Sequence, residues 1–445
     1  MSLYDPAMYH FDTPASCCWQ DMCAPGRAAL PLLEDVHCDV AIIGGGFTGL
    51  SAALHLARDH TLSVRVLEAG EPGWGASGRN GGFCCLYPST LSLEQMSNRY
   101  GEAATLEFVR SQLQAIELIR QLGETEDIDF SAQGEGLYEV AHLPNRLAEL
   151  RDHARTLGTR FGIPARPIER EEFAATVYDS TEQFGALHIS AGFGLNPLAL
   201  VRGLARAAGR HGAICHGSSK VTAWRREGPD HRLHTAHGSV RCRKVIVATN
   251  GYTPEPLIPG LAGRTVPVIS NIITTRPLST QELAAQQWRT EMPCSNTRQL
   301  LFYYRLLADR RFLFGTRGDT TGSPAHAAQM RNWMTQRLGE VFPAWREVPV
   351  SHYWRGFVCM TANGTPALGT LDETGSVLYG LAYHGNGVAA APWTGRLLAR
   401  LAAGACGPGD IPLVMRGPAP RIPLASLRLW YLRSALAWFR WRDRR

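Results

Sequence analysis

A glycine-rich run near the start of the chain has the residue types and spacing of a phosphate-binding loop. The run GGGFTG at 44–49 follows a short apolar strand pattern, Val40 to Ile43, and precedes a helical pattern. In that frame Gly44 permits a tight turn, Gly46 lets the backbone approach a pyrophosphate, and Gly49 lets helix and strand pack closely. The free amides at the helix N-terminus would bind the phosphates. The alternative is a glycine turn that holds no ligand.

An acidic residue completes the pattern of a dinucleotide site. Glu68 ends a second β-branched strand pattern, SVRVLEAG, 24 residues after Gly44. At this position a carboxylate accepts hydrogen bonds from a ribose 2′-hydroxyl, and it would repel the 2′-phosphate of NADP. The glycine runs at 134–139 and 192–197 lack a strand and helix around them, and no second strand with an acid follows 385–391. The sequence therefore predicts one bound dinucleotide.

A second glycine cluster follows closely. The run GWGASGRNGGF at 73–83 contains five glycines, an arginine and an asparagine. Glycine weakens the interior of a helix or strand by roughly 0.5–1 kcal/mol, so this composition indicates a loop whose backbone closely approaches something else.

The elements that must position these loops indicate two domains, because 445 residues exceed what one hydrophobic core usually serves. Strand–helix–strand patterns of a doubly wound α/β domain stop near residue 94, resume near 191 and return near 350. We expect an N-terminal arm at 1–36, a discontinuous dinucleotide-binding domain at 37–94, 191–255 and 350–410, a second domain at 95–190 and 256–349, and a basic tail at 411–445.

Composition excludes several classes of protein. The net charge is +6, and Lys220 and Lys244 are the only lysines. The eleven cysteines, an odd number, and the lack of a leader pattern favour a reducing, cytoplasmic setting. No apolar run is long enough to span a membrane. We expect no metal site, because the N-terminal cysteines lack zinc-site spacing, and no nucleic-acid partner, because no binding motif accompanies the charge.

Together the runs VAIIGGGFTGLSAALHLAR, VLEAG, GASGRNGGF, VIVATNGY and YHGNGVAAAPWTGRLLA resemble a known superfamily of FAD-dependent amino-acid and amine oxidoreductases. It contains the D-amino-acid oxidases and the glycine and sarcosine oxidases, and the branch nearest to this chain contains gamma-glutamylputrescine oxidoreductase. The resemblance extends over about 37–400. It implies an α/β architecture with a Rossmann-like FAD-binding domain, interrupted by a mainly antiparallel-sheet substrate domain.

The resemblance also implies which positions bind FAD. The glycines of the 44–49 loop would hold the pyrophosphate and Glu68 the adenosine ribose. Ser77 and Arg79 would bond phosphate or ribityl oxygens, and the glycines after them would let backbone amides reach the flavin ring. The full set is Gly44, Gly46, Thr48, Gly49, Glu68, Ala69, Ser77, Arg79, Asn80, Gly81, Gly82, Val221, Thr249, Asn250, Gly251, Gly385, Gly387 and Val388.

Oxidation of an amine at a flavin transfers a hydride to flavin N5, and negative charge then grows at N1 and O2. A helix starting near Val388 would direct its N-terminal amides at that charge. His384 is the catalytic candidate, since it would add positive charge if protonated. The alternative for His384 is a capping or buried histidine.

A neutral amine substrate favours an apolar pocket. Tyr303, Tyr304, Trp354 and Phe302 are the candidates to line it, with plain core packing as the alternative for each. Arg305 or Arg317 would bind a substrate carboxylate, or else lie in solvent. Cys359 would permit covalent flavin attachment, but a buried structural thiol fits better.

The resemblance leads to two functional expectations. The first is oxidation of a C–N bond in a small amine or amino acid, with a gamma-glutamylputrescine-like substrate as first choice and hydrolysis of the imine product. Some relatives use a lysine beside the flavin to activate oxygen, and the presumed substrate segments here contain none. The second is therefore a sarcosine, proline or hydroxy-acid dehydrogenase that passes electrons to a quinone or a partner protein.

The C-terminal segment IPLASLRLWYLRSALAWFRWRDRR is apolar and aromatic around most of a helix, with arginines along one edge. It is expected to pack onto the FAD-binding domain, with its last charged residues in water. The alternative is peripheral contact with an anionic membrane surface.

Overall fold

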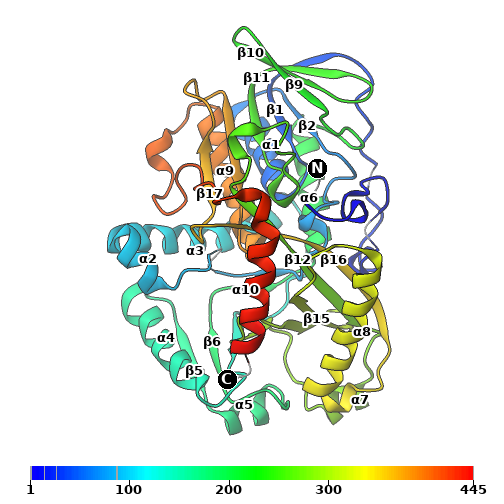
Figure 1. Cartoon of the computed structure of the whole chain (residues 1–445), viewed down its shortest axis with the longest axis vertical. Coiled ribbons are helices and arrows are strands. Elements are labelled where there is room, and N and C mark those ends of the chain that lie inside the picture. The colour runs from blue at the N-terminus through cyan, green and yellow to red at the C-terminus, as the bar shows by residue number, and fades with distance from the viewer. Residues whose placement is uncertain (1–2, 15, 27, 87–88, 444–445) are drawn as a thin grey trace.

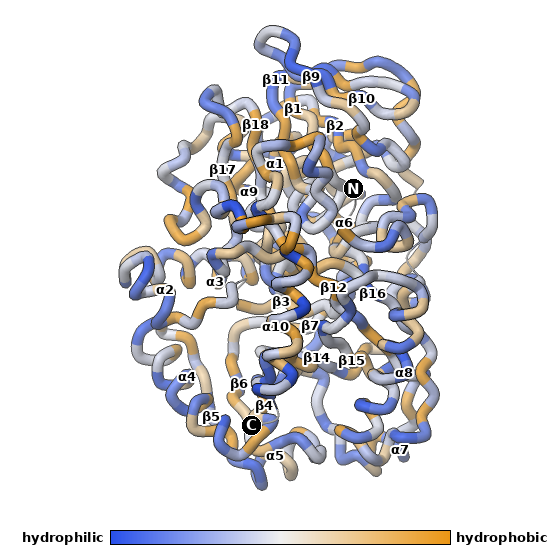
Figure 2. The backbone as a smooth tube through the Cα atoms, viewed as in Figure 1, coloured by the Kyte–Doolittle hydropathy of each residue, from blue (hydrophilic) through white to orange (hydrophobic). Residues whose placement is uncertain are grey.

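Two stacked domains form the molecule. The computed structural model describes residues 3–14, 16–26, 28–86 and 89–443. Sheet one organises the upper domain and sheet two the lower domain, and each sheet has eight strands (Figure 1). Hydrophobic residues follow the central strands of the upper domain, whereas the exposed β9–β10 hairpin is largely hydrophilic (Figure 2).

Sheet one is parallel at its centre and has the order β17-β18-β11-β1-β2-β8. The central strand β1 pairs in parallel with β11 and β2, and only the edge pair β17–β18 and the hairpin pairings are antiparallel. A strand buried on both faces requires a continuous apolar run, which the end of β1 supplies. The strands are β1 (Val36–Ile43), β2 (Val64–Leu67), β8 (Ile214–His216), β9 (Ala223–Glu227), β10 (Asp230–His234), β11 (Ser239–Val247), β17 (Ala367–Thr370) and β18 (Val377–Leu381).

Helices cover this sheet and share one core with it. They are α1 (Phe47–His60), α6 (Pro197–Arg210), α9 (Gly387–Ala402), α2 (Leu93–Tyr100) and α3 (Glu102–Thr125). Helix α1 packs between α6 and α9. Its contact with α9 is very close, because a Cβ on Gly395 would lie 2.3 Å from the carbonyl oxygen of Thr48.

Sheet two is antiparallel except at the β13–β4 pair and has the order β16-β12-β15-β14-β13-β4-β6-β5. Its strands are β4 (Leu137–Val140), β5 (Ala165–Ile168), β6 (Ala186–Ile189), β12 (Thr265–Thr275), β13 (Cys294–Asn296), β14 (Tyr303–Leu306), β15 (Phe312–Arg317) and β16 (Val350–Thr361). Its helices are α4 (Arg146–Phe161), α5 (Arg170–Thr176), α7 (Thr280–Ala285) and α8 (Pro324–Val341). An aromatic core fills the space beneath one face of the sheet and includes Tyr178, Trp288 and Phe312.

The remaining elements are short, apart from the last helix. A two-stranded sheet joins β3 (Phe83–Cys84) and β7 (Phe193–Gly194), and α10 spans Arg428–Arg442. Short 3-10 helices span Pro6–Tyr9, Cys18–Gln20, Ala76–Gly78, Asn250–Tyr252, Pro259–Leu261, Pro343–Trp345, Pro408–Asp410 and Ala425–Leu427.

The sheets confirm the fold class, but two segments belong to a different domain from the one expected. Strand β16 pairs with β12 along its whole length, so residues 350–361 belong to sheet two and not to the first domain. Helix α3 packs on α9 and shares its core, so it covers the first domain although it was expected in the second. Both differences arise because periodicity identifies an element but not the sheet that it joins.

The C-terminal helix also differs from the expectation. Helix α10 runs down across the lower domain (Figure 1) and contacts β12. The carboxylate of Asp443 is buried and accepts hydrogen bonds from the amides of Gln299 and Leu300, at 2.7 and 3.0 Å. Helix α10 therefore packs on the lower domain, although residues 411–419 pack on the upper one, and Asp443 does not lie in water. Arg444 and Arg445 lie outside the described residues.

Candidate functional site

A long pocket, here called the first pocket, lies at the carboxyl ends of β1, β2 and β11. This is the place where open parallel sheets bind nucleotide ligands. Of the residues singled out in the sequence, the following line it: Gly44, Gly46, Thr48, Glu68, Ala69, Ser77, Asn80, Val221, Thr249, Asn250, Gly385, Gly387 and Val388.

Three glycines of the 44–49 loop, Gly44, Gly46 and Gly49, lie where a Cβ would come too close to a neighbouring atom. Gly44 has φ +107°, and a Cβ on it would lie 2.8 Å from the carbonyl oxygen of Ala248. A Cβ on Gly49 would lie 2.0 Å from the carbonyl oxygen of Gly44, so Gly49 lets helix and turn pack and does not itself line the pocket. Helix α1 begins after Gly46 without a side-chain cap at that residue. Its first amides therefore suit an anion, although Ser77 Oγ already accepts from the amide of Phe47 at 2.9 Å.

Glu68 lies at the end of β2 and is held by backbone amides. Its Oε2 accepts from Gly45 N at 2.6 Å and its Oε1 from Gly70 N at 3.0 Å. Burial raises the pKa of the carboxyl, and the two amide bonds only partly counter it. Each carboxylate oxygen keeps a lone pair for another donor, so ribose hydroxyls could bind without displacing either amide.

The N-terminal arm forms part of the wall of the first pocket. Phe11 packs against Trp74 with ring centroids 4.7 Å apart, and Tyr252 meets the Trp74 ring from the side. All three rings line the first pocket, together with Lys220. Phe11 was not predicted to line a site, because the arm has no periodicity to show which of its residues face inward.

A second pocket of about 1210 Å³ lies between the two domains. It is larger than the roughly 300–1,000 Å³ of typical small-molecule sites, so it has room for more than a glycine-sized substrate. The two pockets adjoin, because six residues line both: Ala76, Asn80, Phe357, Val358, Gly385 and Val388. An elongated cofactor in the first pocket would therefore reach the second at the start of α9.

The glycine cluster at 73–83 forms the wall at this junction. Gly82 has φ +72°, and a Cβ on it would lie 2.0 Å from the carbonyl oxygen of Leu195. Gly81 lines the second pocket. The Arg79 guanidinium donates to the carbonyls of Trp74 and Arg355, at 2.8 and 3.2 Å, and lines the second pocket, not the first. Arg79 therefore holds the loop and lies outside the first pocket, where it was expected to bond phosphate or ribityl oxygens.

One row of residues crosses sheet two beneath the second pocket. Glu139, Ser295, Tyr303, Gly315 and Ile272 are register partners on five adjacent strands. Such partners share one face of a sheet. The Tyr303 ring lies directly over Gly315, since a Cβ there would be 2.2 Å from two ring atoms.

The Tyr303 hydroxyl is held in place by a polar neighbour. It bonds Ser270 Oγ at 2.8 Å. Burial raises the pKa of Tyr303 to about 12. The side chain therefore presents a neutral phenol to the second pocket.

Three of the expected pocket residues lie elsewhere. Tyr304 points to the opposite face of the sheet and bonds the Tyr178 hydroxyl at 2.7 Å inside the aromatic core. Phe302 lies in the same core. Trp354 is buried, and its Nε1 donates to the carbonyl of Arg79 at 2.7 Å, so it supports the glycine loop. The alternation of side chains along β14 separates Tyr303 from its neighbours, and the sequence could not show which face carries the pocket.

The two candidate arginines have different places. Arg305 is buried behind the pocket wall and donates to the carbonyls of Gly81 and Leu195, and burial lowers its pKa to about 9. Arg317 lines the second pocket and donates to the carbonyl of His384 at 3.2 Å. Burial also lowers the pKa of Arg317, and among the described residues no carboxylate forms an ion pair with it. Among the described residues, Arg317 and Arg79 are therefore guanidinium groups of the second pocket that an anionic ligand could bind.

His384 differs from the expectation of a charged catalytic group. Its Nε2 lies 3.0 Å from Thr361 Oγ1, and its ring lines neither pocket. Burial lowers its pKa to about 4, so the imidazole is neutral near pH 7. Its backbone has φ +52° and turns the chain toward α9. Gly251, also expected at the cofactor, packs instead against Phe357, since a Cβ on it would lie 2.9 Å from Phe357 Cβ.

The remaining reactive candidates are two lysines and a thiol. Lys244 donates to the carbonyl of Ala402 at 2.7 Å, and Lys220 lies at the first pocket near Val221, so within the described chain neither lines the second pocket. Cys359 is buried at the wall of the first pocket, where burial raises its pKa to about 12. A thiol with this pKa is protonated and is a poor nucleophile.

Comparison with known proteins agrees with this geometry. The model of the FAD-dependent oxidoreductase family (DAO) matches residues 39–401. Gamma-glutamylputrescine oxidoreductase of Escherichia coli is 32% identical over 379 residues, which cover 84% of this chain and 85% of that protein. A probable oxidoreductase, OrdL, of Rhizobium meliloti is 29% identical over 96% of this chain and 97% of its own length.

Solved structures share the fold. Glycine oxidase of Geobacillus kaustophilus superposes with a TM-score of 0.68 at 22% identity, over 82% of this chain and 94% of that one. L-proline dehydrogenase of P. horikoshii superposes with a TM-score of 0.66 at 20% identity, over 83% and 94%.

Proposed function

The chain belongs to the family of FAD-dependent oxidoreductases, and on that premise we propose that it oxidises a carbon–nitrogen bond of a small amine or amino acid. A gamma-glutamylputrescine-like amine is the first-choice substrate, since the E. coli relative of that name is 32% identical over most of both chains. The observation that carries the proposal is the pair of adjoining pockets, the second lined by Arg317, which forms no ion pair with a described residue.

The residues of the first pocket fit FAD. The cradle at 44–49 excludes side chains, the start of α1 suits a pyrophosphate, and Glu68 suits a ribose. The pocket then continues past Ser77 to the start of α9 at the junction. When bound there, FAD supplies the acceptor for the two electrons and the hydrogen removed from the carbon beside the amine.

The residues of the second pocket would bind and orient the substrate. Arg317 would hold a substrate carboxylate by two parallel hydrogen bonds, because its guanidinium faces the pocket. Tyr303 would pack its neutral ring against the reacting carbon. The N-terminal amides of α9 would stabilise negative charge that develops at the junction, since Val388 lines it, Gly387 lines the first pocket beside it, and the N-cap Asn386 provides no side-chain cap.

Acidic groups also line the second pocket, together with Arg160 and Arg298. Glu139, Glu149 and Asp152 line it beside His153, whose Nδ1 lies 3.3 Å from Glu139 Oε2. Glu149 and Asp152 already form ion pairs with Arg146 and Arg155, so Glu139 is the acid that could bind a substrate ammonium group while Arg317 binds a carboxylate. This supports an elongated amino-acid-like amine in preference to glycine.

A second candidate function is supported by one observation. No lysine of the described chain lines the second pocket. A dehydrogenase of the sarcosine, proline or hydroxy-acid type, which passes electrons to a quinone or a partner protein instead of oxygen, is therefore the alternative.

The test is anaerobic flavin reduction by the purified yellow protein with gamma-glutamylputrescine, sarcosine, proline and glycine in separate cuvettes. We expect gamma-glutamylputrescine to bleach the flavin absorbance. The amount of hydrogen peroxide formed per turnover in air then distinguishes an oxidase, which forms it, from a dehydrogenase, which does not. Arg317→Met should raise KM roughly 30-fold or more at unchanged flavin content, and Arg317→Lys should restore part of the loss. The proposal would be contradicted by a protein that takes up no FAD. It would also be contradicted by an Arg317→Met variant with wild-type KM for every carboxylate substrate.

A further inference from the structure

Helix α10 carries an apolar stripe on the side that faces solvent. Leu427, just before the helix, and Trp430, Tyr431, Trp438 and Trp441 are 41%, 63%, 45%, 55% and 45% exposed. Their spacing of three, four and seven residues places them on one side of the helix. The opposite side packs on the protein through Leu429, Leu432, Leu436 and Phe439, of which Leu436 is fully buried. Both sides of α10 are therefore apolar, but only one is covered.

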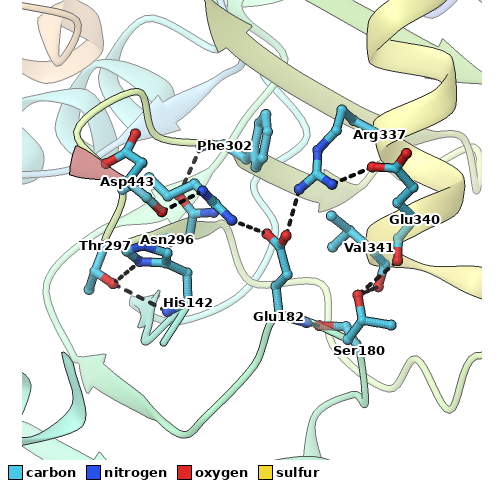
Figure 3. A network of polar contacts seen from close by, with 12 residues as sticks. His142, Ser180, Glu182, Asn296, Thr297, Phe302, Arg337, Glu340, Val341 and Asp443 are labelled. Atoms are coloured by element: carbon cyan, nitrogen blue, oxygen red, sulfur yellow. Dashed lines mark hydrogen bonds and ion pairs between the residues drawn. The ribbon is translucent and has the colours of Figure 1, made fainter. Parts of the chain in front are cut away.

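Polar contacts hold both ends of α10 in place. At its start the Arg428 guanidinium forms two hydrogen bonds to the Glu255 carboxylate, at 2.6 and 2.9 Å. At its end the Asp443 carboxylate caps the amides of Gln299 and Leu300, and its carbonyl accepts from Arg298 at 3.1 Å. Arg298 continues into an ion-pair network with Glu182 in the substrate domain (Figure 3). The stripe is thus presented on a fixed helix.

The segment that carries the stripe has charge of one sign. Residues 411–442 contain no aspartate or glutamate. The arginines of this segment are Arg416, Arg421, Arg428, Arg433, Arg440 and Arg442, of which Arg428 is paired with Glu255. The Arg433 guanidinium lies 5.3 Å from the centre of the Trp430 ring, beside the stripe. An occupant of this surface must therefore be apolar at its centre and negative at its edge.

We propose that the outer face of α10 docks the enzyme on an anionic lipid bilayer. Tryptophan and tyrosine favour the boundary between headgroups and acyl chains, and arginine beside them attracts anionic headgroups. No helix of the described chain is long and apolar enough to span a membrane. The contact is accordingly a surface one, with α10 lying in the plane of the bilayer and the helix axis already fixed by the protein.

The test is flotation of the full-length holoenzyme with vesicles made of equal parts phosphatidylcholine and phosphatidylglycerol, and with vesicles of phosphatidylcholine alone. We expect flotation with the anionic vesicles only, and a marked loss in high salt. The variant Trp430→Ser/Trp438→Ser should reduce the bound fraction at least about tenfold, and Arg433→Gln should weaken it further at low salt.

Trp333→Ser provides a matched control, because Trp333 is 42% exposed on α8 and does not belong to the stripe. It should float like the wild type, and flavin content and melting temperature should be unchanged in every variant. Absence of flotation by the wild type with anionic vesicles would overturn the proposal. Equal flotation of the wild type and Trp430→Ser/Trp438→Ser would also overturn it. A third refuting result would be a wild-type dimer in light scattering that dissociates in the same variant, because a second copy of the chain would then cover the stripe.

Discussion

The contact between Tyr303 and Gly315 gives a quantitative prediction for the second pocket. A Cβ introduced by Gly315→Ala would lie 2.2 Å from two atoms of the Tyr303 ring, whereas ordinary contact begins at 3.4 Å. The ring must therefore move by about 1.2 Å, or the two strands must separate. Overpacking of this kind costs about 1–3 kcal/mol, and loss of the hydroxyl bond to Ser270 costs about 0.5–1.5 kcal/mol.

The activity should fall more than the stability, because Tyr303 lines the pocket. A displacement of about 1 Å at a substrate-positioning group costs on the order of 100-fold in rate. We expect Gly315→Ala to bind flavin normally, to lose about 1.5–4.5 kcal/mol in urea unfolding and to lose on the order of 100-fold in kcat/KM.

A double mutant and a control isolate the cause. Tyr303→Leu in the Gly315→Ala background should recover most of the stability but not the activity, because the overlap is removed together with the ring. Gly158→Ala is the control, since a Cβ on that helical glycine meets nothing within 4 Å. It should not destabilise the protein. Wild-type stability and wild-type kcat/KM in Gly315→Ala would refute the reasoning.

Two other predictions concern the backbone and pH. Gly82→Ala should destabilise the protein by about 2–4 kcal/mol in urea unfolding and reduce flavin occupancy, because the new Cβ would overlap the Leu195 carbonyl. Gly101→Ala is the control: Gly101 also has a positive φ but lies in open space, so this variant should show only the smaller cost of backbone strain. Equal losses of stability in the two variants would contradict the contact with Leu195. His384 has its folded pKa lowered to about 4 from 6.5, so the unfolded chain takes up a proton first, and stability falls as pH drops from 6.5 toward 4. His384→Gln should reduce this loss of unfolding free energy by up to about 3 kcal/mol. The measurement is the free energy of unfolding as a function of pH. An identical pH dependence in both proteins would show that His384 is not buried and neutral.

The cofactor half of the molecule was largely predictable from the sequence. A phosphate-binding turn is local, because Gly44, Gly49 and the start of α1 are contiguous and their spacing follows from backbone geometry. The position of Glu68 follows from the next strand. The fold class and the family, which were predicted from these local motifs, were confirmed.

The substrate half was less predictable, because it depends on which face of a strand meets the other domain. Tyr303 and Tyr304 are adjacent and equally aromatic, yet one lines the pocket and the other lies in the core. Arg305 and Arg317 differ in the same way, since one holds two carbonyls of the wall and the other faces the pocket. A single sequence gives the alternation of a strand but not its orientation.

The route of the chain limits how the two domains can move. Between the sheets the backbone crosses at 126–136, 190–192, 248–264 and 362–366. A hinge needs one or two flexible linkers about which a rigid body turns, and four crossings held in two sheets resist such a rotation. Entry of a substrate to the space between the domains must then depend on local displacement of loops. A covalent cross-link between the two domains, placed away from those loops, should therefore leave turnover unchanged.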